Sequence, residues 1–508
     1  MADTIHGLVV IESQGISFSI TDTKNLNQIE AGSYPVAIGE EVFSQHFLSA
    51  GMTAAIQDAL LAIKQSFADY GVRNYEAYGG QTFFGAENGE FVRDQLMNRT
   101  GVWVHRLAIP EEAYHRSSAV VQNFPHFDQL MQEGTVLVDI GGGTVELIAF
   151  NDGRFSFSRN LKLGPLRVVE ALKDVQRSAD NYVDILREFI DSRILDFIRL
   201  LPERHDYKHM ILMGSSLRSL GDIWPDKRAA ELKLDEFSDT YRTVTHASDQ
   251  FLTKKYNIDP DFIEQVLPTI TLVHQLIRQL DPDAVSISNL RIIDGLEVNT
   301  ALAAGSKAVK FDPTDETISS ALTLSNWYHV DEAHRDATVT FALQLFDRLH
   351  KLHGLGKRER LLLQTAALIT DIGSYIDTHQ HGKNTEYIIL SSDIVGLSGR
   401  EQRIVATIAR YHTSDIPQVV LSGQRNLRGS DRLVVAKLSA LLRVADALDA
   451  SRRQKIDAIA ISTRGEKVTI TATTHESLEL EKWSLTQKGH FFEAVYGLPL
   501  KLKGRNTL

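Results

Sequence analysis

The segment with the clearest chemical potential runs from Val138 to Leu147, where an aspartate is followed by three glycines and a threonine. Consecutive glycines let backbone N–H groups approach a phosphate group without interference from a Cβ atom. Asp139 ends a strand-like run and offers oxygen ligands to a divalent cation, while Thr144 adds a hydroxyl donor. The pattern predicts phosphate binding at Gly141, Gly142, Gly143 and Thr144, and an Mg²⁺ (or Mn²⁺) site at Asp139 and Glu146.

Glycine-rich turns are common, and the alternative interpretation of this segment is a tight turn with an exposed aspartate. Two other phosphate-binding motifs are excluded. No Gly-Lys-Ser/Thr sequence follows the glycines, so the segment is not a Walker loop. The residues from Val145 to Phe150 are typical of a strand and not of a helix, which excludes a dinucleotide-binding fingerprint.

The elements that would position this loop occur in duplicate. Gly7–Ser13 and Ile16–Asp22 are predicted to be two strands joined by a tight turn, and a similar strand pair begins at Thr135. A third strand is predicted at Arg154–Ser158. The repetition favours two α/β halves around a cleft over one doubly wound sheet.

Helices are expected between and after these strands. Thr53–Tyr70 has apolar residues at helical spacing, and Glu111–Val121 has acidic residues in its first turn, whereas Trp103–Ile109 is strand-like. After about residue 305 long amphipathic helices dominate, until two strands are predicted at Ile456–Ile461 and Val468–Thr474. We therefore expect an α/β fold with domains at 1–128 and 129–308, followed by a mainly helical domain with a short terminal β segment at 309–508.

Composition narrows the classes of function. The chain has 508 residues, a net charge of -11 and no cysteine, which excludes disulfides, thiolate zinc sites and cysteine nucleophiles. The acidic balance argues against general binding to nucleic acid or to an anionic membrane. The N-terminus lacks a basic flank before an apolar run, and no segment has the length of a membrane helix. A cytoplasmic location is expected.

Four motifs, in order, resemble the Ppx/GppA family of exopolyphosphatases and guanosine-pentaphosphate phosphohydrolases. Asp139–Leu147 is similar to its second phosphate loop, Ile109–Ala113 to its Glu-Glu-Ala segment, Leu161–Arg167 to its Gly-x-x-Arg segment, and Met213–Arg218 to its later glycine turn. The resemblance covers essentially the whole chain. It implies two actin-like halves of ribonuclease H-like topology around a cleft, followed by an HD-like helical domain.

The resemblance also implies roles for individual residues. Glu112 corresponds to the proposed base that activates the attacking water, and Asp139 to a residue that positions Mg²⁺ or phosphate. Without the resemblance, Glu112 is explained equally well by the helix dipole. Ser17, Gly214 and Ser215 are expected to contact phosphate. The implied reaction is release of terminal phosphate from inorganic polyphosphate or guanosine pentaphosphate, and the implied assembly is a homodimer.

Two departures from the family pattern leave other functions open. In the first phosphate loop, Glu12 replaces the usual aspartate and Ile16 replaces an asparagine, while Phe84 replaces an arginine that would hold phosphate. A lost charge-assisted contact of this kind is worth about 1.5–3 kcal/mol. The alternatives are a weakened protein that binds polyphosphate or an alarmone as a sensor, and an ATP-dependent kinase or chaperone, which the poor first loop argues against.

The helical domain resembles HD-type metal-binding domains in the order of five residues: His334, Asp371, His381, His412 and Asp446. Thr370 stands where the motif has a histidine, and threonine is a poor metal ligand. We therefore expect a structural or substrate-channel use of this domain in preference to metal-dependent catalysis.

Overall fold

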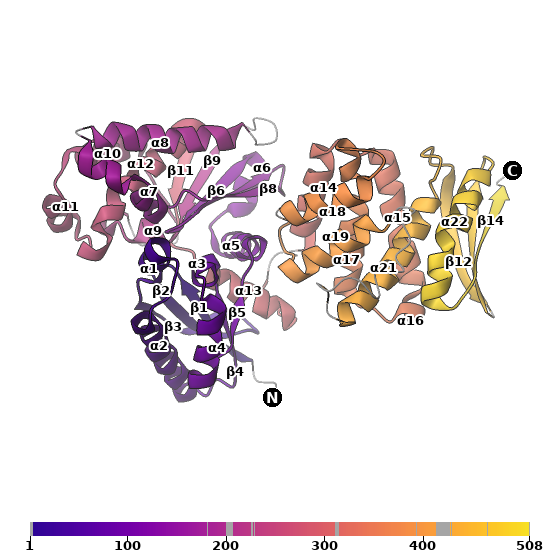
Figure 1. Cartoon of the computed structure of the whole chain (residues 1–508), viewed down its shortest axis with the longest axis horizontal. Coiled ribbons are helices and arrows are strands. Elements are labelled where there is room, and N and C mark those ends of the chain that lie inside the picture. Colours follow the sequence, from indigo (N-terminus) through magenta and orange to yellow (C-terminus); the bar gives the residue numbers. More distant parts are fainter. Residues whose placement is uncertain are drawn as a thin grey trace. The chain divides into compact units, whose positions relative to one another are not determined.

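The computed structural model describes residues 4–179, 181–199, 207–224, 227, 229–309, 314–392, 394–412, 427, 429–464 and 466–506. The chain forms two compact units, Met1–Pro313 and Thr314–Leu508, here called the N-terminal and C-terminal units (Figure 1). Among the described residues, no helix combines the length and apolar character needed to cross a membrane.

The N-terminal unit contains two sheets. The first has the strand order β3-β2-β1-β4-β5 and the second the order β10-β11-β9-β6-β7-β8. The strands of the first sheet are β1 Ile5–Glu12, β2 Gly15–Asp22, β3 Asn27–Pro35, β4 Asn74–Gly79 and β5 Val104–Arg106. Those of the second are β6 Thr135–Ile140, β7 Val145–Asn151, β8 Arg154–Leu161, β9 His209–Met213, β10 Ala230–Glu231 and β11 Ala284–Ile287.

The two sheets share one topology. In the first, β1 pairs antiparallel with β2 and parallel with β4. In the second, β6 pairs antiparallel with β7 and parallel with β9. Five strands of each sheet therefore correspond in order, and the predicted duplication of α/β halves is confirmed.

Helices cover both sheets. In the first half they are α1 Ile38–Gln45, α2 Ala50–Asp69, α3 Gln81–Gly85, α4 Gly89–Thr100 and α5 Ile109–Asn123. The remaining helices of the unit are α6 Phe127–Glu133, α7 Pro165–Ser178, α8 Tyr182–Ile198, α9 Ser215–Arg218, α10 Leu234–His246, α11 Asp249–Tyr256, α12 Ile263–Leu280 and α13 Ile292–Ala303. Helix α2 buries the apolar residues that predicted it, including Ile56, Leu60 and Phe67.

Helices α5 and α13 pack together and fix the position of α5 (Figure 1). A Cβ atom on Gly295 of α13 would lie 1.7 Å from the carbonyl oxygen of His115 in α5, so only glycine permits this approach. On its other side α13 packs against β1, through Leu8, Val10 and Leu296. These contacts hold one face of α5 in a defined position near the strand ends.

The strand predicted at Trp103–Ile109 is shorter than expected. Only β5, Val104–Arg106, is a strand, and Ile109 already begins α5. A proline in the first turn of α5 explains the difference, because its fixed φ angle suits a helix start.

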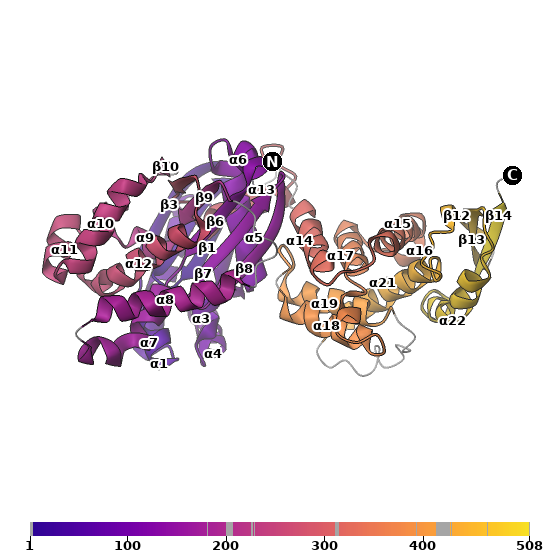
Figure 2. The same ribbon diagram turned by 90° about the horizontal axis from the view of Figure 1, so that it is seen from above.

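The C-terminal unit is a helical bundle followed by a small sheet. Its helices are α14 Thr314–Trp327, α15 Glu332–Arg348, α16 His350–His353, α17 Lys357–Leu368, the 3-10 helix η3 Ile372–Tyr375, α18 His381–Ser391, α19 Gly399–Arg410 and α21 Gly429–Ala447. The terminal elements are β12 Ile456–Arg464, β13 Lys467–Thr474, α22 Glu479–Tyr496 and β14 Leu500–Asn506. Figure 2 shows α22 beside the three-stranded sheet, and Phe492 of α22 shares a core with Ile470 of β13.

Candidate active site

A cavity of about 950 Å³ lies between the two halves of the N-terminal unit. We call it the cleft cavity. Four parallel strands, β1, β4, β6 and β9, end at it, and the residues that follow each strand line its wall. Ligands of α/β sheets commonly bind at the carboxyl ends of such strands. The lining after these strand ends comprises Glu12–Ser13, Gly80–Thr82, Gly141–Thr144 and Gly214–Ser215.

The glycine loop after β6 faces this cavity. A backbone hydrogen bond from Gly141 N to Thr144 O, 2.9 Å long, closes the turn. The carbonyl of Gly142 accepts from Leu166 N at 2.9 Å and so ties the loop to the start of α7. Gly214 and Ser215 also line the cavity, next to the end of β6, because β9 pairs with β6.

Ser17 does not belong with these residues. It lies within β2, paired in register with Val10 of β1 and Ser33 of β3, and its exposed fraction is 6%. The residue of that hairpin that lines the cavity is Ser13. Ser17 is thus not among the residues that line the cavity, and its position within β2 does not support the predicted phosphate contact.

Three carboxylates converge on one guanidinium at the base of the cleft. Arg116 contacts Glu112 (Nη2 to Oε2, 3.2 Å), Glu146 (Nη1 to Oε2, 2.6 Å) and, through Nε, Asp139. All four residues are buried. Since Glu146 lies on β7, Asp139 on β6 and Glu112 on α5, three separate elements contribute to the cluster. We call these residues the carboxylate cluster.

The Glu112 carboxylate is held at both oxygens. Its Oε1 accepts from the backbone N–H of Gln81 at 3.0 Å, and its Oε2 accepts from Arg116. Burial raises the pKa of Glu112 above its ordinary value of 4.5, against the lowering effects of Arg116 and of the Gln81 amide. A raised pKa suits a general base that must take and later release a proton near neutral pH.

Arg116 was missed from the sequence. Burial alone would disfavour its charge, but Asp139, Glu146 and Glu112 together raise the pKa of the guanidinium above its ordinary value, so it stays charged. The signal that could have found it is its spacing: Arg116 follows Glu112 by four residues, which places both on one helix face.

The residues of the carboxylate cluster fit a divalent cation in donor type, because Mg²⁺ and Mn²⁺ prefer carboxylate oxygens. The predicted ligands Asp139 and Glu146 do lie beside each other, but both contact Arg116. A divalent cation at this place therefore competes with a resident positive charge.

Further cations face the cavity. Lys162, Arg167, Arg193, Arg218 and Arg291 line it. Phe84 does not: its ring is buried in α3, and the guanidinium groups of Arg93 and Arg106 lie 5.9 and 5.5 Å from the ring centroid. A buried phenylalanine thus stands where the family pattern has an arginine. The positive charge at the cavity comes from residues of other elements.

In the C-terminal unit the five HD-like positions come together. Asp371, His381 and His412 place one donor atom each within 4.8 Å of one another. His334 Nε2 lies 3.3 Å from Asp446 Oδ1 and 3.9 Å from Asp371 Oδ2. Thr370 contributes no donor to this group: its hydroxyl donates to Ala367 O at 3.3 Å.

Comparison with known proteins finds a family match in the C-terminal unit and relatives of low identity over about two thirds of the chain. Residues 317–491 match the family model described as Ppx/GppA phosphatase, domain III. The chain is 24% identical over 353 residues to a guanosine-5'-triphosphate,3'-diphosphate pyrophosphatase of Vibrio vulnificus, covering 66% of this chain and 65% of the relative. The counterpart of Vibrio campbellii is 22% identical over 348 residues, 66% of each. The match thus spans just under two thirds of these relatives' own lengths.

Solved structures agree in fold. An exopolyphosphatase from Cytophaga hutchinsonii aligns with a TM-score of 0.52 at 15% identity, over 60% of this chain and all of that one. An exopolyphosphatase-like protein aligns with a TM-score of 0.52 at 13% identity, over 60% of this chain and 99% of that one. This likeness supports the expected α/β fold over the part of the chain that aligns.

Proposed function

We propose that the chain, whose residues 317–491 match the family model of Ppx/GppA phosphatase domain III, hydrolyses phosphoric anhydrides, releasing terminal phosphate from inorganic polyphosphate or a guanosine pentaphosphate-type nucleotide. The observation that carries the proposal is the position of Glu112, a buried carboxylate that lines the cleft cavity together with the glycine loop Gly141–Thr144. A base beside a phosphate-binding loop is the arrangement that in-line attack by water requires.

The roles of the residues follow from their positions. The backbone amides of Gly142–Thr144 and of Gly214–Ser215 bind the terminal phosphate, since N–H groups at glycine turns favour anions. Glu112 accepts a proton from the attacking water. Arg167 and Arg218, which line the same cavity, neutralise phosphate oxygens as charge develops on them.

We expect Mg²⁺ or Mn²⁺ as the cofactor. Asp139 and Glu146 are the residues that would hold the ion, in competition with Arg116. When bound, the ion supplies charge neutralisation to phosphate oxygens. By resemblance, we also expect a cytoplasmic homodimer.

A second candidate function is a sensor that binds polyphosphate or an alarmone without hydrolysing it. The observation in its favour is that Arg116 contacts one oxygen of each of the three carboxylates, Glu112, Asp139 and Glu146. These contacts compete with a catalytic divalent cation. The replacement of the family's arginine by Phe84 also favours a sensor, because it removes a group that would hold phosphate.

The experiment that separates the two compares wild type with Glu112→Gln for phosphate release from long-chain polyphosphate and from guanosine pentaphosphate, with Mg²⁺. Loss of a general base lowers the rate by about 10²–10⁴-fold. Glu111→Gln is the matched control, because Glu111 is the neighbouring carboxylate and accepts from Ala108 N at the start of α5. Hydrolysis that is lost only in Glu112→Gln supports the enzyme. Equal background rates in all three proteins, with binding retained, support the sensor.

A further inference from the structure

Three donor atoms in the C-terminal unit converge from three different elements. Asp371 immediately precedes η3, His381 begins α18, and His412 follows α19. His381 Nε2 lies 3.4 Å from His412 Nε2, and Asp371 Oδ1 lies 3.3 Å from His412 Nε2 and 3.9 Å from His381 Nε2. A point in the plane of these atoms is about 2.1 Å from all three, which is the length of a zinc–nitrogen or zinc–oxygen bond.

The hydrogen bonds of the two imidazoles fix which nitrogen faces this point. His381 Nδ1 lies 3.0 Å from Thr378 O, and His412 Nδ1 contacts Ala409 O. A carbonyl oxygen can only accept, so each Nδ1 carries a hydrogen, and in the neutral form of each imidazole Nε2 presents a lone pair. A histidine that ligates a metal is ordinarily oriented in this way, by a hydrogen bond from its other nitrogen.

Two lone pairs and a carboxylate oxygen that converge repel one another unless a proton or a metal cation lies among them, and the three atoms are arranged so that one metal ion can contact all of them. The nearest side-chain cations contact other atoms. Arg452 binds Asp371 through Oδ2, and Lys488 binds Asp446. Asp371 Oδ1 is thus left facing the two imidazoles, while the contact with Arg452 holds the carboxylate in place.

We propose that Asp371, His381 and His412 bind one divalent transition-metal ion. Two imidazoles with a single carboxylate favour Zn²⁺ or Co²⁺ over Mg²⁺ or Ca²⁺, which prefer all-oxygen sites. This use of the domain differs from the structural or channel role expected from the sequence, and it does not depend on the reaction proposed for the cleft cavity.

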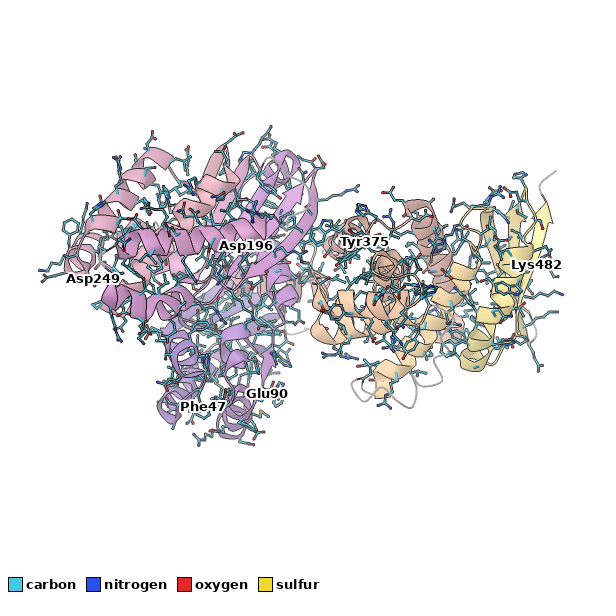
Figure 3. The ribbon with its side chains drawn as sticks, turned by 45° about the horizontal axis from the view of Figure 1, so that its top comes forward. Phe47, Glu90, Asp196, Asp249, Tyr375 and Lys482 are labelled. Atoms are coloured by element: carbon cyan, nitrogen blue, oxygen red, sulfur yellow. The ribbon has the colours of Figure 1, made fainter. Side chains whose placement is uncertain are left out.

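The site has an open side. The three protein donors leave at least one coordination position for water or for an oxygen of an anionic ligand. The His381 side chain is 26% exposed and that of Arg452 is 47% exposed, so solvent reaches the site beside a cation. Tyr375, four residues after Asp371, is exposed on the surface of the same unit (Figure 3). His334 and Asp446 border the site on the side of Asp371 Oδ2.

The test is a metal titration of the untagged, chelator-treated full chain with Zn²⁺ by calorimetry and with Co²⁺ by visible absorption. We expect one Zn²⁺ per chain, and a Co²⁺ spectrum typical of nitrogen ligation. His381→Gln and Asp371→Asn should each weaken this binding by at least about tenfold, since changes even to outer-shell partners cost 10–100-fold. His379→Gln is the matched control, because His379 is exposed and lies two residues from His381.

Because the His381 side chain is partly exposed, we expect the His381→Gln protein to fold. Its circular dichroism spectrum and its thermal unfolding without metal should match those of wild type. The proposal is overturned if a folded His381→Gln protein binds Zn²⁺ as tightly as wild type. It is also overturned if the ion is lost in Asp139→Asn but retained in the His381 and Asp371 variants, which would assign it to the cleft. A third contrary result is the absence of metal binding together with a hydrogen on His412 Nε2 by NMR.

Discussion

The guanidinium of Arg116 lies one helical turn beyond Glu112 on α5 and donates from Nη2 to Glu112 Oε2 at 3.2 Å. The same side chain contacts Asp139 and Glu146, which come from the adjacent strands β6 and β7. One residue thus links the proposed base to the proposed cation ligands. The charge of Arg116 lowers the pKa of Glu112. Its guanidinium also occupies the position beside Asp139 and Glu146 where a divalent ion would bind.

Replacing Arg116 with methionine should destabilise the chain and create a dependence on divalent cations. Removing one partner of a buried ion pair costs about 3–5 kcal/mol, because the other charges stay buried and uncompensated. Mg²⁺ should restore part of the lost stability by binding the freed carboxylates of the native state. Thermal unfolding with EDTA and with Mg²⁺, beside calorimetric Mg²⁺ titration, measures both effects.

The control for that experiment is Arg242→Met, which removes an exposed arginine that pairs with Asp239 of its own helix α10. It should leave stability and Mg²⁺ affinity close to wild type. An Arg116→Met protein whose melting temperature is unaffected by Mg²⁺ would contradict competition between the arginine and a divalent ion.

The raised pKa of Glu112 predicts the pH dependence of stability. The native state holds the Glu112 proton more tightly than the unfolded chain, so this group's contribution to stability is present below pH 4.5 and is lost as pH rises through the raised pKa. Between pH 4.5 and the raised pKa, the unfolding free energy of Glu112→Gln should therefore fall less steeply with pH than that of wild type. Urea unfolding at a series of pH values measures it; parallel curves for the two proteins would contradict the assignment.

The same group sets the pH dependence of activity. A general base works only when ionised, so kcat/KM should fall as pH drops through the raised pKa of Glu112, with a limb above pH 4.5. Arg116 lowers that pKa, so its replacement should move the limb to higher pH. A pH profile of phosphate release by the wild-type and Arg116 variant proteins measures the shift. If the acidic limb does not move, the group that titrates is not Glu112.

Arg167 should contribute to binding of the anionic substrate. It lies on α7, lines the cleft cavity, and places its guanidinium 5.1 Å from the ring centroid of Phe43. A charge-assisted hydrogen bond is worth about 1.5–3 kcal/mol, so Arg167→Gln should lower kcat/KM by roughly 10–150-fold. Arg177→Gln, on the same helix but exposed and outside the cavity lining, should change it little. Equal losses in both variants would point to a general charge effect.

Gly214→Ala should destabilise the N-terminal unit. Gly214 has a φ angle of 124°, and a Cβ atom there would lie 2.4 Å from Ile140 O and 2.5 Å from Asp139 Oδ1. Backbone strain of this kind costs about 1–3 kcal/mol, before any displacement of Asp139. Gly51→Ala serves as the control, because its nearest non-neighbouring atom is 3.7 Å away and alanine favours a helix. Denaturant unfolding of both variants tests the contrast.

Much of the architecture was predictable because its signals are local. The strand pairs around Gly15 and around Gly141 are set by alternation and turn residues within about twenty positions, and their recurrence predicts duplicated halves. The helix at Thr53–Tyr70 follows from apolar spacing in the same way. The end of β5 was misjudged, since an apolar run before a proline suits a strand or a helix start equally well.

The sequence by itself determined which chemical groups are present: the glycine loop at Gly141, the carboxylates Glu112 and Asp139, and the order of His381 and His412. Only the tertiary structure decided their neighbours. It placed Arg116 among three carboxylates, put Ser13 instead of Ser17 at the cavity, and brought Asp371 to two imidazoles. The physical reason is that backbone propensity acts over a few residues, whereas distances between residues far apart in the chain are set by how helices and sheets pack.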